Sequence, residues 1–185
     1  DPSHQEEFTR RASACDVGVC AADNEPAKFA FDALMRAAGR PWTLGEVLSG
    51  GIGGWVHRFE AGGACYGCVA SYLKREVTEQ PAGPPPDYSN PGAPQPETTI
   101  PASKASIATI AGMHALVTVG SGLPAFSLLF SLQAVAGVFD APFRAHKFHI
   151  PRAPACLTCG AAADLPTGDR LDAAVDDALA RLGAR

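Results

Sequence analysis

The stretch CDVGVCAADNEPAKFAFDALMRAAGRPWTLGEVLS, residues 15–49, decides the fold class of this protein. Residues 15–22 are rich in small and β-branched residues and predict a buried strand. A helix is predicted next, because Asn24 is a good N-cap, a proline falls in the first turn, and apolar residues recur at helical spacing until Gly39. Residues 40–49 predict a second strand. The order strand, helix, strand indicates an α/β protein that contains a parallel pair of strands.

The rest of the chain continues this mixed pattern. Alternating aromatic residues after a cluster of four glycines predict a third strand, and the cluster itself predicts a turn or bulge. Ser103 is a good N-cap for a helix that ends near Val119. Its expected apolar members are Ile107, Ile110, Ala111 and Leu116, and the other expected strands are residues 54–62, 126–135 and 143–150. The sequence therefore predicts a mixed sheet.

Two segments bear on domain organisation. Residues 76–101 carry eight of the 16 prolines, which favours an extended crossover loop over a helix. Residues 164–185 predict a C-terminal amphipathic helix, with acidic residues near its start and arginines near its end. We expect one α/β domain over residues 1–163, with the proline-rich loop inside it, followed by this helix.

Composition and charge exclude some classes of function. With 46% hydrophobic and 18% charged residues, the chain has the composition of a globular domain. Its net charge of -4 and the lack of a basic block argue against a nucleic-acid partner.

A long uncharged segment raises the question of a membrane. Residues 105–139 contain no Asp, Glu, Lys or Arg, so they are either a membrane span or a buried helix followed by a buried strand. Glycines and a proline in the middle of the segment favour the helix and strand, and thus no membrane partner. The polar N-terminus lacks the apolar core of a signal peptide, and we expect a cytoplasmic protein.

Four cysteines form two CxxC pairs, Cys65 with Cys68 and Cys156 with Cys159, each beside a glycine. Such turns direct two thiolates toward one tetrahedral ion, and four sulfurs close the coordination shell of zinc. Between Cys68 and Cys156 lie 87 residues, whereas small zinc ribbons have a gap of about 15 to 20 residues. The spacing predicts a structural zinc ion that ties distant parts of one domain together.

Other uses of the four cysteines are a redox pair, disulfides or a coincidental spacing. A redox pair requires a cysteine at a helix N-terminus, whereas we expect Cys65 to follow a strand. Disulfides are disfavoured in an acidic cytoplasmic chain that keeps two further cysteines, Cys15 and Cys20.

Taken in order, these features resemble the ThiF/MoeB family of adenylyltransferases, which are related to ubiquitin-activating enzymes. The similarity covers a strand that ends in Asp-Asn and the next helix (residues 16–42), a glycine-rich turn and strand that lead into the first cysteine pair (49–68), and a late strand with the second pair (143–160). The resemblance implies the C-terminal part of a Rossmann-like domain with a mixed sheet and a structural zinc site.

The activity implied by the resemblance is ATP-dependent adenylation of the C-terminal glycine of a ubiquitin-like or sulfur-carrier protein. By the same match, Asp23 would be the catalytic acid that helps to hold magnesium and ATP. Asn24 and Lys28 would also contact the nucleotide, although Asn24 can equally be only the N-cap, and Lys28 only a solvated helix charge.

The sequence departs from the family at the N-terminal side. The phosphate-binding loop and the strand and helix around it are missing, and the glycine cluster at residues 50–54 opens no helix. ATP and magnesium binding would thus need a completing half, supplied by a longer protein or another chain. A homodimer is a further possibility by analogy. The alternative function is a non-catalytic, zinc-stabilised module that binds a protein tail.

Overall fold

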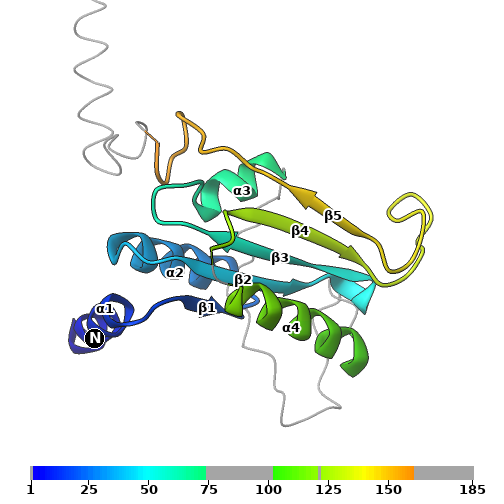
Figure 1. Ribbon diagram of the computed structural model, residues 1–185, viewed down its shortest axis with the longest axis horizontal. Helices are drawn as coiled ribbons and strands as arrows, with labels where there is room; N and C mark the ends of the chain where they lie inside the picture. Colours follow the sequence, from blue (N-terminus) through cyan, green and yellow to red (C-terminus); the bar gives the residue numbers. More distant parts are fainter. Residues whose placement is uncertain (1, 74–101, 121, 161–185) are drawn as a thin grey trace, which may run out of the picture.

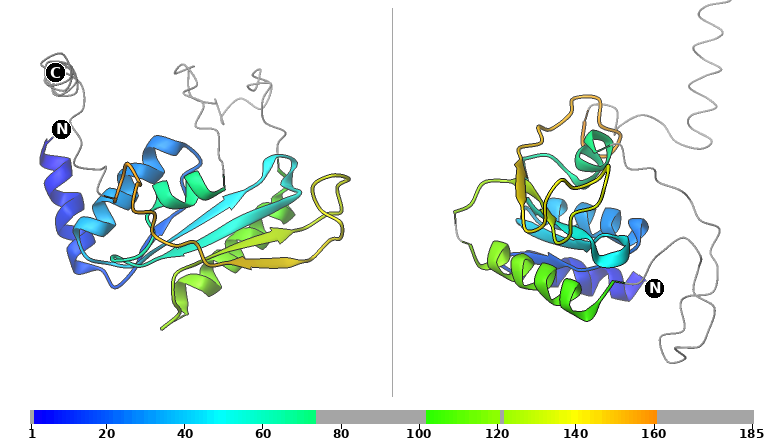
Figure 2. Two further views of the ribbon diagram at one scale, coloured as in Figure 1. Left: turned by 90° about the horizontal axis from the view of Figure 1, so that it is seen from above. Right: turned by 90° about the vertical axis from the view of Figure 1, so that its right-hand side faces the viewer.

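The structure is a computed structural model that describes residues 2–73, 102–120 and 122–160. In this part of the chain, a five-stranded mixed sheet has helices on both faces (Figures 1 and 2). The elements in chain order are α1 (Pro2–Ala14), β1 (Gly18–Cys20), α2 (Glu25–Ala37), β2 (Trp42–Val47), the 3-10 turn η1 (Ser49–Gly51), β3 (Gly53–Phe59), α3 (Tyr66–Tyr72), α4 (Lys104–Val119), β4 (Phe126–Ser131) and β5 (Ala145–Phe148). The predicted α/β class with a mixed sheet is confirmed.

The strands lie in the sheet in the same order as in the chain, β1-β2-β3-β4-β5. β1 and β2 are parallel and are joined by α2, while the remaining neighbours are antiparallel. Gly50 and Gly51 have positive φ values of 72° and 65° in the tight connection from β2 to β3, which a residue with a side chain rarely adopts. The predicted turn at the glycine cluster is therefore confirmed.

Alternation along the strands divides the core into two layers. Trp42 pairs with Phe59 across β2 and β3, and their rings stack with centroids 4.1 Å apart. This face packs against α2 and α3, and the buried residues of this layer include Met35, Leu44 and Tyr66. The opposite face packs against α4 (Figure 2).

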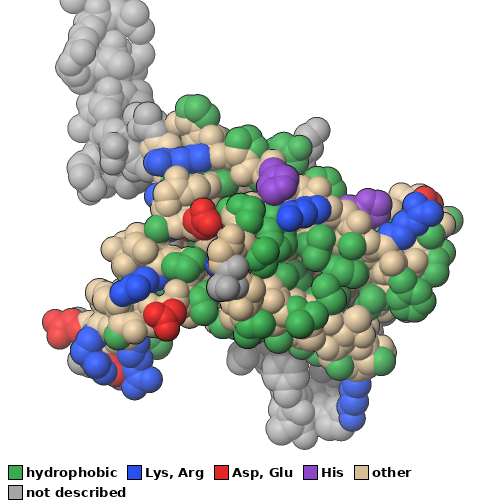
Figure 3. Space-filling view, in the orientation of Figure 1, with side chains coloured by type: hydrophobic (Ala, Val, Ile, Leu, Met, Phe, Trp, Pro, Cys, Tyr) green, Lys and Arg blue, Asp and Glu red, His purple; other side chains and the backbone are tan. Residues whose placement is uncertain are grey.

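The side chains that α4 buries against the sheet differ in part from the expected ones. Ile110 is buried against the sheet as predicted, but Ile107 and Leu116 are 48% and 64% exposed. His114 is buried instead, and a hydrogen bond of 2.9 Å joins its Nε2 to the Thr43 hydroxyl. Hydrophobic side chains accordingly gather over α4 and the neighbouring sheet, whereas charged ones gather near α1 (Figure 3).

β1 also differs from its prediction. It is three residues long and lies at the edge of the sheet, so Val19 is 54% exposed and only Gly18 and Cys20 are buried. The fully buried strand predicted over residues 15–22 is wrong in this respect.

The uncharged stretch at residues 105–139 forms most of α4 and then β4. None of the helices in the described ranges has the length and apolarity that crossing a membrane requires. The proline-rich loop at residues 76–101 and the helix predicted at residues 164–185 both lie outside the described residues.

Candidate metal centre

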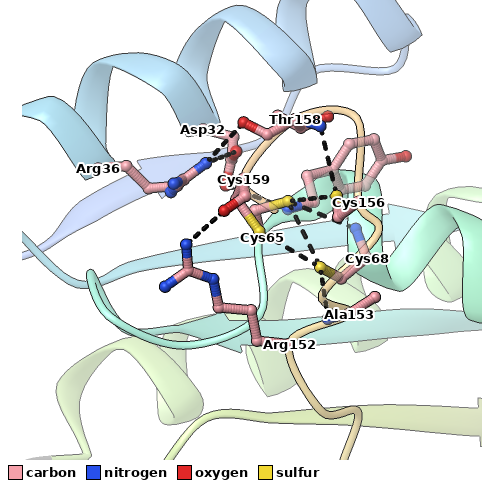
Figure 4. A network of polar contacts seen from close by, with 10 residues as sticks. Asp32, Arg36, Cys65, Cys68, Arg152, Ala153, Cys156, Thr158 and Cys159 are labelled. Carbon is pink, nitrogen blue, oxygen red and sulfur yellow. Dashed lines mark hydrogen bonds and ion pairs between the residues drawn. The ribbon is translucent and has the colours of Figure 1, made fainter. Parts of the chain in front are cut away.

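The four cysteines predicted as metal ligands meet at one point of the structure (Figure 4). The first pair lies where the turn after β3 enters α3, and the second pair lies in the loop that follows β5. All four Sγ atoms lie within 4.8 Å of one another. Residues 91 positions apart in the chain thus form a single cluster.

The sulfur separations fit a tetrahedral ion. They are 3.7 Å between Cys65 and Cys68, 3.6 Å between Cys65 and Cys156, and 3.5 Å between Cys68 and Cys159. Four sulfurs at the usual Zn–S distance of about 2.3 Å would be about 3.8 Å apart. A disulfide, in contrast, has sulfurs about 2.05 Å apart, and all six cysteines are free thiols in the structure. The cluster can hold a metal ion such as zinc.

Backbone N–H groups around the cluster donate hydrogen bonds to three of the four sulfurs. Cys68 N–H donates to the Sγ of Cys65, Ala153 N–H to that of Cys68, and Thr158 N–H to that of Cys156, each at 3.4 Å. Hydrogen bonds of this kind favour the thiolate, which is the form that binds metal.

Close approach of the two turns requires a glycine. A Cβ atom at Gly67 would lie 2.4 Å from the Thr158 hydroxyl and 3.4 Å from the Cys156 sulfur. The small residue between Cys65 and Cys68 therefore lets the second pair reach the first.

The thiols do not share one proton affinity. Burial raises the pKa of Cys65 and Cys68 above that of a free thiol. Burial acts in the same direction on Cys156, but the backbone N–H groups of Thr158 and Cys159 and the neighbouring thiols outweigh it and lower its pKa to about 6. Cys156 thus gives the first thiolate of the cluster.

Three charged side chains secure the two turns from outside (Figure 4). Asp32 of α2 is fully buried and accepts a hydrogen bond from Tyr66 N–H at 3.1 Å, next to Cys65. Arg36, one turn later, donates to the Thr158 carbonyl at 3.3 Å, and Arg152 donates to the Cys159 carbonyl. Helix α2 therefore contacts both cysteine turns.

The start of α3 corrects one expectation. Cys65 is the N-cap residue of α3, so it lies at a helix N-terminus and does not simply follow a strand. The argument against a redox pair from the expected position of Cys65 was therefore wrong. What disfavours a redox pair in the structure is the presence of four sulfurs, not two, at metal-binding separations.

The residues expected to contact a nucleotide lie at the N-terminus of α2. Asp23 is exposed and lies in the short connection between β1 and α2. The Asn24 side chain accepts from Ala27 N–H at 2.9 Å, which confirms its N-cap role. Lys28 is 5% exposed, so it is not a solvated helix charge.

Lys28 is enclosed by two carboxylates. Its Nζ atom donates to Glu25 and Glu46, each at 2.7 Å. Burial would lower the pKa of Lys28, but the charges and hydrogen bonds of Glu46 and Glu25 outweigh it and raise the pKa. The ammonium group therefore stays charged.

The polar contacts of Lys28 continue through Glu46 to two residues on neighbouring strands, His57 and Ser127, which were not predicted as part of a site. Glu46 Oε2 lies 3.1 Å from Nε2 of the fully buried His57, and His57 Nδ1 lies 2.8 Å from the Ser127 hydroxyl. Glu25 also accepts from the Tyr66 hydroxyl at 2.7 Å. An acidic residue within a buried strand was the signal available for Glu46, whereas His57 and Ser127 depend on strand register.

Comparison with known proteins gives no family. No family model matches the sequence, and no curated protein matches it. Among solved structures, 27 chains match. One is the crystal structure of E. coli MccB with MccA-N7isoASN, which is 14% identical to this chain with a TM-score of 0.48. The match covers 78% of this chain and 41% of that chain. This chain spans less than half the length of that protein.

Proposed function

We propose that the four cysteines bind one zinc ion and that its role is structural. The donor set contains only sulfur, which suits zinc better than magnesium or calcium. Four protein ligands leave no coordination position for water or substrate. The ion would then hold the loop after β5 against α3 and α2.

We further propose that the chain is a portion of an ATP-dependent adenylyltransferase that activates the C-terminal glycine of a ubiquitin-like or sulfur-carrier protein. The observation that supports it most is the position of Asp23 and Asn24. They follow the carboxyl end of a strand in a parallel pair and directly precede α2, and ligands of α/β sheets bind at such edges. The resemblance to the ThiF/MoeB family expects the same residues there.

Adenylation brings a carboxylate up to the α-phosphate of an anionic nucleotide. Alignment and charge neutralisation therefore make up most of the catalysis. Magnesium, when bound, would neutralise phosphate charge. Asp23 is exposed and can reach a ligand at this edge, while Asn24 fixes the first turn of α2. ATP would also need a phosphate-binding half, which this sequence does not contain.

A second candidate function is a non-catalytic, zinc-stabilised module that binds a protein tail. The environment of Lys28 favours it. The ammonium group already has two carboxylate partners at 2.7 Å, and Lys28, Glu25 and Glu46 together carry one net negative charge. A phosphate would have to displace Glu25 or Glu46 to bind Lys28.

One set of measurements tests both parts of the proposal. Elemental analysis with a thiol count should give one zinc per chain and four thiols released together on chelation. No metal, with free or oxidised thiols, would refute the zinc centre.

ATP-pyrophosphate exchange should then be measured for the zinc-loaded protein together with the longer protein or second chain that supplies the phosphate-binding half, with a peptide that ends in Gly-Gly as the acceptor. Asp23→Ala should abolish exchange, whereas Asp16→Ala, at another exposed aspartate before β1, should leave it unchanged. No exchange once the phosphate-binding half is present would refute the enzyme proposal. Peptide binding that persists in Asp23→Ala would then support the binding module.

A further inference from the structure

Tyr66 lies inside the first cysteine pair, and its hydroxyl contacts Glu25 at the start of α2. It is fully buried, and its ring has Phe29 and Phe59 as edge-on neighbours, with centroids 5.1 and 6.5 Å away. The backbone N–H donates to Asp32 of α2 at 3.1 Å. The residue that follows Cys65 is thus held at a fixed position against α2.

The phenol of Tyr66 contacts the lysine cluster at the N-terminus of α2. Its O–H donates to Glu25 Oε2 at 2.7 Å, while Glu25 Oε1 accepts from Lys28 Nζ at 2.7 Å. Lys28 Nζ also lies 5.9 Å from the centroid of the Tyr66 ring, within cation-π range. One side chain therefore joins the cysteine turn to both members of an ion pair.

We propose that Tyr66 is a positioning residue that couples metal occupancy of the four-cysteine cluster to the Glu25–Lys28 end of α2. An ion bound by Cys65 and Cys68 fixes the turn between them, and so fixes the backbone and ring of Tyr66. The phenol then holds Glu25 over Lys28 and keeps the lysine enclosed. The coupling rests on the proposed function in one respect only, the binding of metal.

The physical reason for coupling is the weakness of the turn without an ion. Its sulfurs then have only N–H···S hydrogen bonds and one another as partners. Without an ion to join the four sulfurs, these weak contacts alone hold the turn, so it can open and release the tyrosine. Outer contacts of metal ligands are known to orient a site in this manner.

Lysine acylation measures the enclosure of Lys28 without any need for enzyme activity. The protein is treated briefly with acetic anhydride, and the rate at each lysine is read by mass spectrometry after digestion. Tyr66→Phe removes only the hydroxyl that binds Glu25. Tyr72→Phe is the matched control, since Tyr72 lies on the same helix and is 57% exposed. Lys104, which is exposed, serves as the reference lysine.

In metal-loaded protein, Tyr66→Phe should raise the acylation rate of Lys28 about tenfold, as expected for the loss of a hydrogen bond to a charged group. Tyr72→Phe should match the unchanged protein, and Lys104 should react equally in all three. Chelation should raise the Lys28 rate in the unchanged protein but add little in Tyr66→Phe, where the link is already broken. Metal content should stay the same, because Tyr66→Phe leaves all four sulfurs in place.

The outcomes separate the inference from the proposed function. Absence of bound metal would refute the zinc centre and the coupling together. Bound metal with the same Lys28 rate in the unchanged protein and in Tyr66→Phe would refute the coupling and leave the zinc centre standing. If Tyr66→Phe does not fold, Glu25→Gln tests the same link from its other side, and a Lys28 rate that still depends on chelation as in the unchanged protein would overturn the inference.

Discussion

Replacement of Lys28 by methionine tests whether burial makes its ion pairs important for stability. Lys28 Nζ donates to Glu46 at 2.7 Å, with the two side chains only 6% and 11% exposed. Removal of the lysine leaves buried carboxylates without their cation, which costs about 3 to 5 kcal/mol in comparable pairs. We expect Lys28→Met to lower the free energy of unfolding by about 3 kcal/mol, because Glu25 is partly exposed and can turn to water.

Arg10→Met is the matched control, because Arg10 also forms an ion pair of 2.7 Å, with Glu7. The two side chains of that pair are 69% and 41% exposed, so its loss should leave the free energy of unfolding unchanged within error. The assay is urea unfolding of the metal-loaded protein, followed by circular dichroism. Equal midpoints for Lys28→Met and Arg10→Met would show that the burial argument is wrong.

The pH dependence gives an independent check of the same pair. The folded-state pKa of Lys28 is raised above its ordinary value of 10.5. The stabilisation is therefore complete below pH 10.5 and is lost as the pH rises through the higher folded value. The difference in stability between the unchanged protein and Lys28→Met should shrink above this pH, and a constant difference would contradict the assignment.

Three further changes test other contacts. Asn24→Ala removes the N-cap of α2 and should lower the free energy of unfolding by about 1 kcal/mol, which thermal unfolding measures; Asn24→Asp, which keeps the acceptor, should recover most of the loss. In metal-free protein at pH 7, iodoacetamide should alkylate Cys156 before Cys65, since the pKa of Cys156 is lowered to about 6 and that of Cys65 is raised; the reverse order by mass spectrometry would contradict this. Burial lowers the pKa of His114 below 6.5, so stability should fall as the pH drops from 6.5 through that lower value, and His114→Gln should flatten this part of the urea midpoint profile.

Local sequence patterns were enough to predict the elements whose signals lie within a few residues. The N-caps Asn24 and Ser103 mark the starts of α2 and α4, and the alternation in β3 is visible in the sequence. Helix α1 was not predicted, because its residues are mostly polar and no apolar stripe marks it. α3 was not predicted either, since it is only seven residues long and begins inside the cysteine motif.

The candidate site also has one part that could be predicted from the sequence and one part that could not. The cysteine ligands could be predicted because each pair carries its own spacing, and the two pairs need only to meet. The cluster around Lys28 could not be predicted, because Lys28 lies on α2, Glu46 lies on β2 18 positions later, and Ser127 lies on β4 70 positions beyond His57. Only the register of β2, β3 and β4 brings these side chains to one face.

The sequential strand order also has a consequence for the order of folding. Pairing of β2 with β3 closes only a short turn, so it costs little chain entropy, whereas joining Cys65 to Cys156 closes a loop of 91 positions, at a cost of about 4 to 5 kcal/mol from an open chain. Once β4 and β5 have added to the sheet, most of that chain entropy has already been lost. The ion is thus expected to enter last, and its concentration should change the lifetime of the folded chain more than the rate at which the sheet forms.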